Sequence, residues 1–147
     1  MRLYHYRDFW RAQISALIQL AKADNDFDGL EKLHILYLAR THDIGEQEVV
    51  EMERNPLPLP DFSELSEEEK FEFLYNLVQI MKIDGEVYNS EIEYCEDIAV
   101  QMGFDKEVIK EMSARIYANP SITPDIESLK KDVFKLDKHP NFGRVLV

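Results

Sequence analysis

Two short acidic stretches of this 147-residue chain have the residue types and spacing of a metal site. Each follows an apolar run that ends near a lysine, and each closes with a glutamate that opens the next predicted helix; together they supply Asp24, Asp26, Glu31, Asp84, Glu86 and Glu91. The second trio follows the first at a constant offset, since 84 minus 24 equals 91 minus 31. Because all of these ligands are oxygen atoms, a bound metal would be a hard cation, Ca²⁺ or Mg²⁺ rather than Zn²⁺.

A purely structural role explains the two helix-opening glutamates but not, by itself, Asp24 and Asp84. Glu31 and Glu91 would complement the positive N-terminal ends of their helices. Asp24 and Asp84 are expected near helix C-terminal ends, where a negative charge is unfavourable and needs compensation. A bound cation, the lysine two residues earlier, or a backbone amide in the turn could supply it. Metal binding and turn architecture therefore both remain open.

An EF-hand is excluded as the form of this site. Residues 24–29 match the opening of an EF-hand loop, Asp-x-Asp-x-Asp-Gly, which also requires an apolar residue at position eight and a glutamate at position twelve. The chain has Glu31 and Ile35 at those two positions, and the second acidic stretch lacks the opening pattern.

The sequence does not indicate a catalytic centre. Glu31 and His34 have the spacing of a di-iron ligand pair, but a ferritin-like site needs two such pairs, and the second copy has Tyr94 in place of the histidine. Cys95 occupies an apolar helical position and is interpreted as a buried structural thiol. There is no glycine-rich phosphate loop, nucleophile elbow or zinc-ligand spacing. We therefore expect a protein that is not an enzyme.

The acidic stretches belong to a longer internal repeat. At the same offset, identical residues occur at Leu17/Leu77, Gln19/Gln79, Lys22/Lys82, Asp24/Asp84, Glu31/Glu91, Ala39/Ala99, Glu51/Glu111 and Met52/Met112. Such self-similarity at one fixed period indicates a duplicated supersecondary unit. The first copy covers about residues 8–55 and the second about 66–117. Three prolines make residues 56–61 an extended linker between them.

Every predicted element is a helix, because apolar residues recur with helical spacing and no stretch demands a strand. The predicted helices cover about residues 7–23, 30–40, 46–54, 66–83, 90–101, 105–117 and 124–136. Capping boxes begin at Ser66 and Ser90, Asp105 and Thr123 are predicted N-caps, and Gly103 follows the end of the fifth helix. The expected fold is all-α: a single domain of about seven helices in one bundle, built from a duplicated three-helix unit.

The predicted core follows the helical stripes and the apolar matches across the repeat. The first helix has a broad apolar stripe that includes Trp10 and Leu17. In the second helix we expect four side chains to face inward: Leu33, Leu36, Tyr37 and Leu38. Three matched pairs are expected to be buried: Leu17/Leu77, Leu38/Ile98 and Ala39/Ala99.

Composition narrows the range of partners. Seventeen basic residues against 29 acidic ones give a formal charge of −12, which repels nucleic-acid phosphates and anionic lipid and favours cations and basic protein surfaces. A single cysteine excludes an internal disulfide and suits a reducing compartment. No apolar run approaches the eighteen or so residues of a membrane-spanning helix. We expect a cytoplasmic protein.

The two stretches Lys22–Glu31 and Lys82–Glu91 resemble the signature of the TerB-like family, the helical module of tellurite-resistance protein B. The signature is an apolar helix, an acidic turn and a glutamate on the next helix, present in two pseudo-symmetric copies. The resemblance covers roughly residues 8–117. It implies a seven-helix cytoplasmic bundle without catalysis of its own, a metal site at these carboxylates, and a role in stress-response or tellurium-response complexes.

Two functions follow from these observations. The first is a non-enzymatic module that binds a divalent cation at its acidic turns and acts through partner proteins in a stress or tellurite-resistance-type response. The alternative is a structural protein-interaction domain without a metal, whose acidic residues are helix caps.

Overall fold

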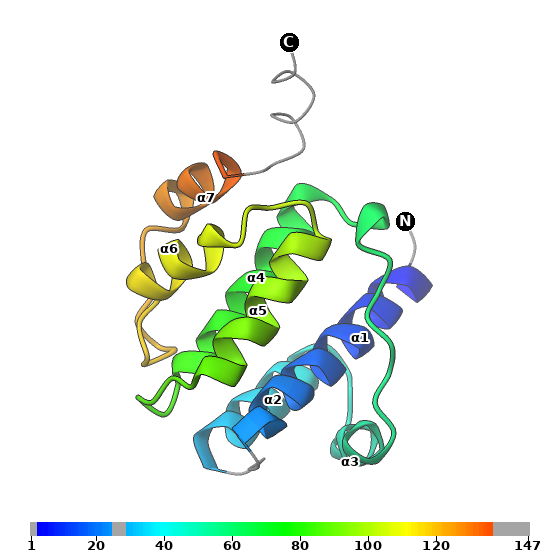
Figure 1. Cartoon of the computed structure of the whole chain (residues 1–147). Coiled ribbons are helices and arrows are strands. Elements are labelled where there is room, and N and C mark those ends of the chain that lie inside the picture. The colour runs from blue at the N-terminus through cyan, green and yellow to red at the C-terminus, as the bar shows by residue number, and fades with distance from the viewer. Residues whose placement is uncertain (1–2, 25–28, 137–147) are drawn as a thin grey trace. The chain divides into compact units, whose positions relative to one another are not determined.

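The computed structural model describes residues 3–24 and 29–136, and all of their regular structure is helical (Figure 1). This part of the chain contains seven α-helices: α1 Leu3–Ala21, α2 Gly29–Thr41, α3 Glu46–Arg54, α4 Glu67–Lys82, α5 Asn89–Gln101, α6 Glu107–Arg115 and α7 Ile126–Phe134. Short 3-10 turns, Lys22–Asp24 and Phe62–Glu64, follow α1 and precede α4. The predicted all-α fold is confirmed. None of the described helices is both long and apolar enough to cross a membrane.

The chain divides into two compact units, residues 1–61 and 62–147. Unit 1 contains α1 to α3, and unit 2 contains α4 to α7. The boundary follows residue 61, which is the last residue of the predicted linker. The single domain expected from the sequence stays a prediction.

Unit 1 is built on α1, which packs against both α2 and α3. The apolar stripe of α1 is buried as predicted, with Trp10 only 2% exposed and Leu17 fully buried. The hydroxyl oxygen of Ser15 accepts a hydrogen bond from the backbone N–H of Leu57 at 2.9 Å. This bond fixes the start of the proline-rich stretch to the central helix of the unit.

Unit 2 is built on α4, which lies beside α5 (Figure 1), while α6 packs against both helices and α7 packs against α6. Phe73 and Leu77 of α4 are fully buried. The guanidinium of Arg115 donates to the carboxylate of Asp132 at 2.6 Å, which connects α6 to α7. The C-terminal helix is therefore part of this unit.

The ends of α2 and α5 have the same geometry. The backbone N–H of Ile44 donates to the carbonyl of Ala39 at 2.8 Å, and the N–H of Phe104 donates to the carbonyl of Ala99 at 3.0 Å. The residue before each donor has a positive φ, 63° in unit 1 and 98° in unit 2, where it is Gly103. This confirms the predicted glycine at the end of the fifth helix. Equal hydrogen bonds at equivalent positions of the repeat are what a duplicated unit would produce.

The inner face of α2 was predicted incorrectly. Leu33 and Tyr37 are 65% and 56% exposed, while Ile35 and Ala39 are buried together with Glu31. Residues at i, i+4 and i+8 share one side of a helix, so Glu31, Ile35 and Ala39 form the inner face, and Leu33 and Tyr37 lie on the other side. Leu36 and Leu38 are half-buried. Of the matched pairs, Leu17/Leu77 and Ala39/Ala99 are buried as predicted, whereas Leu38/Ile98 is buried only at Ile98.

The predicted N-cap Asp105 lies one residue before the N-cap of α6, Lys106, and its side chain accepts the backbone N–H of Glu107 at 2.9 Å. The predicted starts of two other helices, α5 and α7, were wrong. The N-cap of α5 is Tyr88 rather than Ser90, because the carboxylate of Glu91 accepts the Tyr88 backbone N–H at 3.0 Å. The N-cap of α7 is Asp125 rather than Thr123, and its side chain accepts the backbone N–H of Ser128 at 3.1 Å. In both cases a carboxylate supplies the capping bond, in place of the hydroxyl that the sequence suggested.

Candidate functional site

The second acidic turn is held by its own carboxylates. Asp84 accepts the backbone N–H of Glu86 at 3.0 Å, and the intervening Gly85 has a φ of 85°. The hydroxyl of Tyr88 donates to the carboxylate of Glu86 at 2.5 Å. Asp84 and Glu86 are exposed, whereas Glu91 is only 1% exposed and bonds the Tyr88 backbone. Each of the three carboxylates therefore has a hydrogen bond within the turn.

The first acidic turn is described in part. Glu31 is 7% exposed and is the third residue of α2, as Glu91 is the third residue of α5. Asp26 and the side chain of Asp24 lie outside the described residues. Within the described part of the chain, no three His, Cys, Asp or Glu side chains are grouped so that they could bind a metal ion. Metal binding at the six predicted carboxylates stays a prediction, and the hydrogen bonds of the second turn support the capping alternative there.

The lysine before each acidic turn donates hydrogen bonds to backbone carbonyls near the end of another helix. The ammonium of Lys22 donates to the carbonyl of Glu53 at 3.3 Å. The ammonium of Lys82 donates to the carbonyls of Ser113 and Ile116 at the end of α6, and burial lowers the pKa of Lys82. Carbonyls at a helix C-terminus lack intrahelical donors, so a cation is favourable there. For Asp84, the structure shows compensation by the backbone amide of the turn.

The side chains considered for catalysis, Cys95 and His34, are buried or partly buried. Cys95 is fully buried, and burial, with the nearby Glu91 and Glu96, raises its pKa. A thiol of raised pKa is a poor nucleophile at neutral pH. Burial lowers the pKa of His34 and raises that of Tyr94 to about 12. These properties agree with the interpretation of Cys95 as a structural residue.

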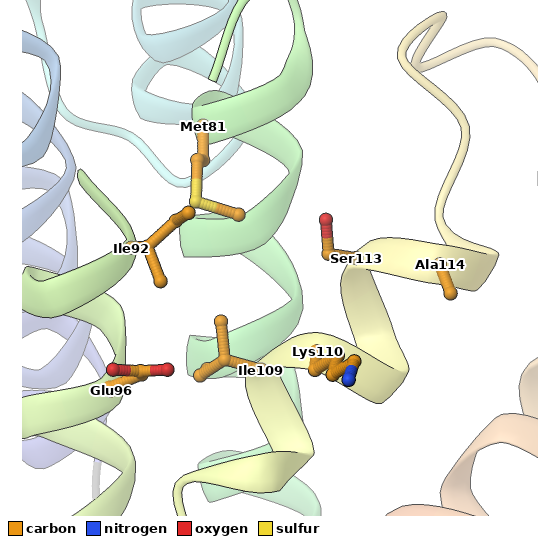
Figure 2. Close-up of a pocket in the computed structure, with 7 residues that line it drawn as sticks. All are labelled: Met81, Ile92, Glu96, Ile109, Lys110, Ser113 and Ala114. Carbon is orange, nitrogen blue, oxygen red and sulfur yellow. The ribbon is translucent and has the colours of Figure 1, made fainter. Parts of the chain in front are cut away.

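An apolar groove lies between α5 and α6, with α4 at its base. Its volume is about 430 Å³, and it is lined by Met81, Ile92, Glu96, Ile109, Lys110, Ser113 and Ala114 (Figure 2). Met81 and Ile109 are each 1% exposed and form its floor. Figure 2 shows Ile109 between the carboxylate of Glu96 on α5 and Lys110 on α6. The groove thus combines an apolar floor with charged edges.

Two small residues of α6, Ser113 and Ala114, line this groove. At the equivalent positions of the repeat, unit 1 has Glu53 and Arg54 where unit 2 has Ser113 and Ala114. The groove was not predicted from the sequence, because its lining is not marked by polar residues shared between the two copies. The sequence did contain another signal: at two neighbouring positions, a large charged residue in one copy corresponds to a small residue in the other.

No protein-family model, curated protein or solved structure matches this chain significantly.

Proposed function

We propose that this chain is a non-catalytic helical module that acts by binding another protein, and that the groove between α5 and α6 is its binding surface. The observation that carries this proposal is the groove of about 430 Å³ with Met81 and Ile109 at its floor. Grooves of this type accept the apolar face of an amphipathic helix. Glu96 on the α5 edge of the groove favours a basic residue beside the apolar face of the partner helix, and Lys110 on the α6 edge favours an acidic one.

In this proposal the acidic turns have a structural role. Asp84 and Glu91 each accept a backbone N–H, which supports a capping role in the turn that positions α5. The resemblance to the TerB-like family supports a module that works through partners rather than by catalysis. Divalent-cation binding and a role in a stress or tellurite response are separate hypotheses that the same resemblance suggests.

An NMR titration of the full chain with a synthetic helical peptide of leucine and lysine tests the groove. We expect the largest methyl shifts at Ile92 and Ile109. A variant with Ser113→Glu and Ala114→Arg introduces the residues that unit 1 has at these positions, and it should weaken binding at least tenfold.

The matched control exchanges two exposed charges on α7, Glu127→Arg with Lys131→Glu, and leaves net charge unchanged, as the groove variant does. This control should bind the peptide as the wild-type chain does. Shifts spread over the whole acidic surface, or equal binding by the groove variant, would contradict the proposal.

A further inference from the structure

A second cavity lies in unit 1, between the N-terminal half of α1 and the end of α2. Its volume is about 440 Å³, and its lining consists of Tyr6, Arg7, Thr41, His42 and Asp43. Small-molecule sites have volumes of roughly 300–1,000 Å³. The cavity is therefore large enough for a small ligand, and it shares no lining residue with the groove.

Two aromatic side chains line this cavity. The ring of His42 stacks on Trp10, with 3.5 Å between the ring centroids, and the ring of Tyr6 lies 6.1 Å from that of His42. The Nδ1 atom of His42 lies 2.9 Å from the carbonyl oxygen of Leu38, which can only accept a hydrogen bond, so Nδ1 carries the proton. The neutral ring therefore has an acceptor left at Nε2, and Tyr6, which is 49% exposed, has a ring face on which a cation can lie.

Asp43 occupies a position that disfavours an aspartate. Its φ is 63°, in the left-handed region, and it comes two residues after the end of α2, where a negative charge is unfavourable. The equivalent residue of unit 2 is Gly103, with a φ of 98°, so the shared turn requires the backbone conformation and not a carboxylate. Among the described residues, none donates a hydrogen bond to the carboxylate of Asp43. Because residues in strained conformations cluster at ligand-binding sites, this carboxylate is a candidate ligand-binding group.

The other charged side chain of the lining, Arg7, already has a partner. Its guanidinium donates to both carboxylate oxygens of Glu48, at 2.8 and 3.0 Å, and to the backbone carbonyl of Asp43 at 2.8 Å. Arg11 also donates to Glu48. The Asp43 carboxylate is thus the charge of the lining that is available to a ligand, and the net charge of −12 favours a cation over an anion.

We propose that this cavity binds a primary alkylammonium group, the chemistry that free aliphatic amines share with the lysine side chains of other proteins. The carboxylate of Asp43 pairs with the ammonium, which donates to Nε2 of His42 and contacts the ring face of Tyr6. A cation at this place also compensates the negative end of α2. Because Asp43 and Tyr6 are exposed, water competes for both and the affinity is low. The inference is independent of the proposed function, since all of its residues belong to unit 1.

An NMR titration of the full chain with butylammonium tests this site. Saturable shifts are expected at Tyr6, His42 and Asp43, while neutral butanol and anionic butyrate should bind at least tenfold more weakly. Asp43→Asn keeps a residue that tolerates the left-handed backbone and removes the charge, so it should weaken butylammonium binding at least tenfold. Glu46→Gln removes the same charge from an exposed site of unit 1 and is the matched control, which should bind like the wild-type chain.

Two further probes separate the sources of the ammonium group. Diaminobutane represents a free amine and N-acetyl-lysine amide a protein side chain, and the tighter binder of the two indicates which source the site favours. Tighter binding of butyrate would overturn the inference, since Arg7 would then be the binding group. The absence of saturable shifts at the cavity, or unchanged butylammonium binding by folded Asp43→Asn, would also overturn it. If Asp43→Asn does not fold, the comparison of the three butyl probes on the wild-type chain decides.

Discussion

Unit 1 and unit 2 agree in their interiors and differ on their surfaces. In each unit the lysine at the start of the acidic stretch donates to a backbone carbonyl 31 residues later, Lys22 to Glu53 and Lys82 to Ser113. On the outside, an apolar face of α2 corresponds to an acidic face of α5. Packing constrains the inner positions more than the outer ones, which accounts for interiors that agree and surfaces that differ.

The same comparison shows where the lining of the groove differs in sequence from the equivalent positions of unit 1. The lysine-to-carbonyl bond holds the end of α6 in unit 2 and α3 in unit 1 in the same way. The difference lies at the residue whose carbonyl accepts this bond and at the residue after it, where Ser113 and Ala114 replace Glu53 and Arg54.

The largest expected effect concerns the matched core leucines. Leu17→Ala and Leu77→Ala each remove a fully buried side chain and should cost about 2–5 kcal/mol of the free energy of unfolding. Each unit has its own probe, because the single tryptophan, Trp10, lies in unit 1 and the single cysteine, Cys95, lies in unit 2. Tryptophan fluorescence and thiol labelling in guanidinium would follow the two units separately.

These two leucine variants also test the single domain predicted from the sequence. If the chain unfolds as one cooperative domain, each substitution shifts both transitions equally. If the units unfold separately, Leu17→Ala shifts the fluorescence transition alone and Leu77→Ala shifts thiol labelling alone. A loss well below about 1 kcal/mol at either leucine would contradict the burial on which the comparison depends.

The next largest effect concerns the two lysines. Lys82→Met leaves two carbonyls of the α6 end without their donor and should cost about 1.5–3 kcal/mol, the range for hydrogen bonds to charged groups. Lys22→Met removes one bond of 3.3 Å and should cost less, about 0.5–1.5 kcal/mol. Lys106→Met, at an exposed position, is the control and should change stability by less than about 0.5 kcal/mol. Equal losses for Lys22 and Lys82 would show that the shared bond matters equally in both units.

The accuracy of the predicted buried positions differed between helices. Nearly every residue of α1 from Phe9 to Ala21 is buried, so its broad apolar stripe placed Trp10 and Leu17 correctly. The sequence of α2 is apolar almost all round, so its pattern has no phase, and packing against α1 and α3 decides that Leu33 points outward. Hydrophobicity alone cannot separate such faces.

Of the candidate site, only the polar residues of the acidic turn were predicted from the sequence. The sequence identified Glu91 as a helix-start residue, and the structure places it there, although its capping partner is Tyr88. The groove escaped prediction because it is an empty space bordered by Ile92 and Ile109, which individually read as ordinary core residues. Such a space depends on the relative position of three helices, which no local pattern encodes.

A smaller effect separates capping from cation binding at the acidic turns. With EDTA present, Glu91→Ala should cost about 0.5–2 kcal/mol, as the loss of a capping side chain does, while Glu91→Gln keeps an acceptor oxygen and should cost less. If the turn binds a cation instead, Asp84→Asn with Glu91→Gln should stabilise the metal-free protein by relieving repulsion. Thermal melts with millimolar Ca²⁺ or Mg²⁺ complete the test, and a rise in melting temperature that this neutral pair abolishes would establish the metal site. Glu31→Gln applies the same test to unit 1.

The smallest expected effect is a difference in pH dependence between the units. Burial lowers the pKa of His34 below its ordinary value of 6.5, so the unfolded chain binds a proton at this residue more readily than the folded chain does. Stability from the neutral imidazole is therefore complete above pH 6.5 and is lost as the pH falls below that value. Unit 2 has Tyr94 at the equivalent position, where burial raises the pKa to about 12, so this residue does not titrate between pH 5 and 8.

His34→Tyr introduces the unit 2 residue into unit 1. In urea unfolding followed by Trp10 fluorescence, the wild-type chain should lose more stability than this variant between pH 7 and pH 5. The two should run parallel above pH 7. A wild-type chain that gains stability relative to the variant on acidification would mean that His34 is stabilised in its charged form, and the environment assigned to it in α2 would then be wrong.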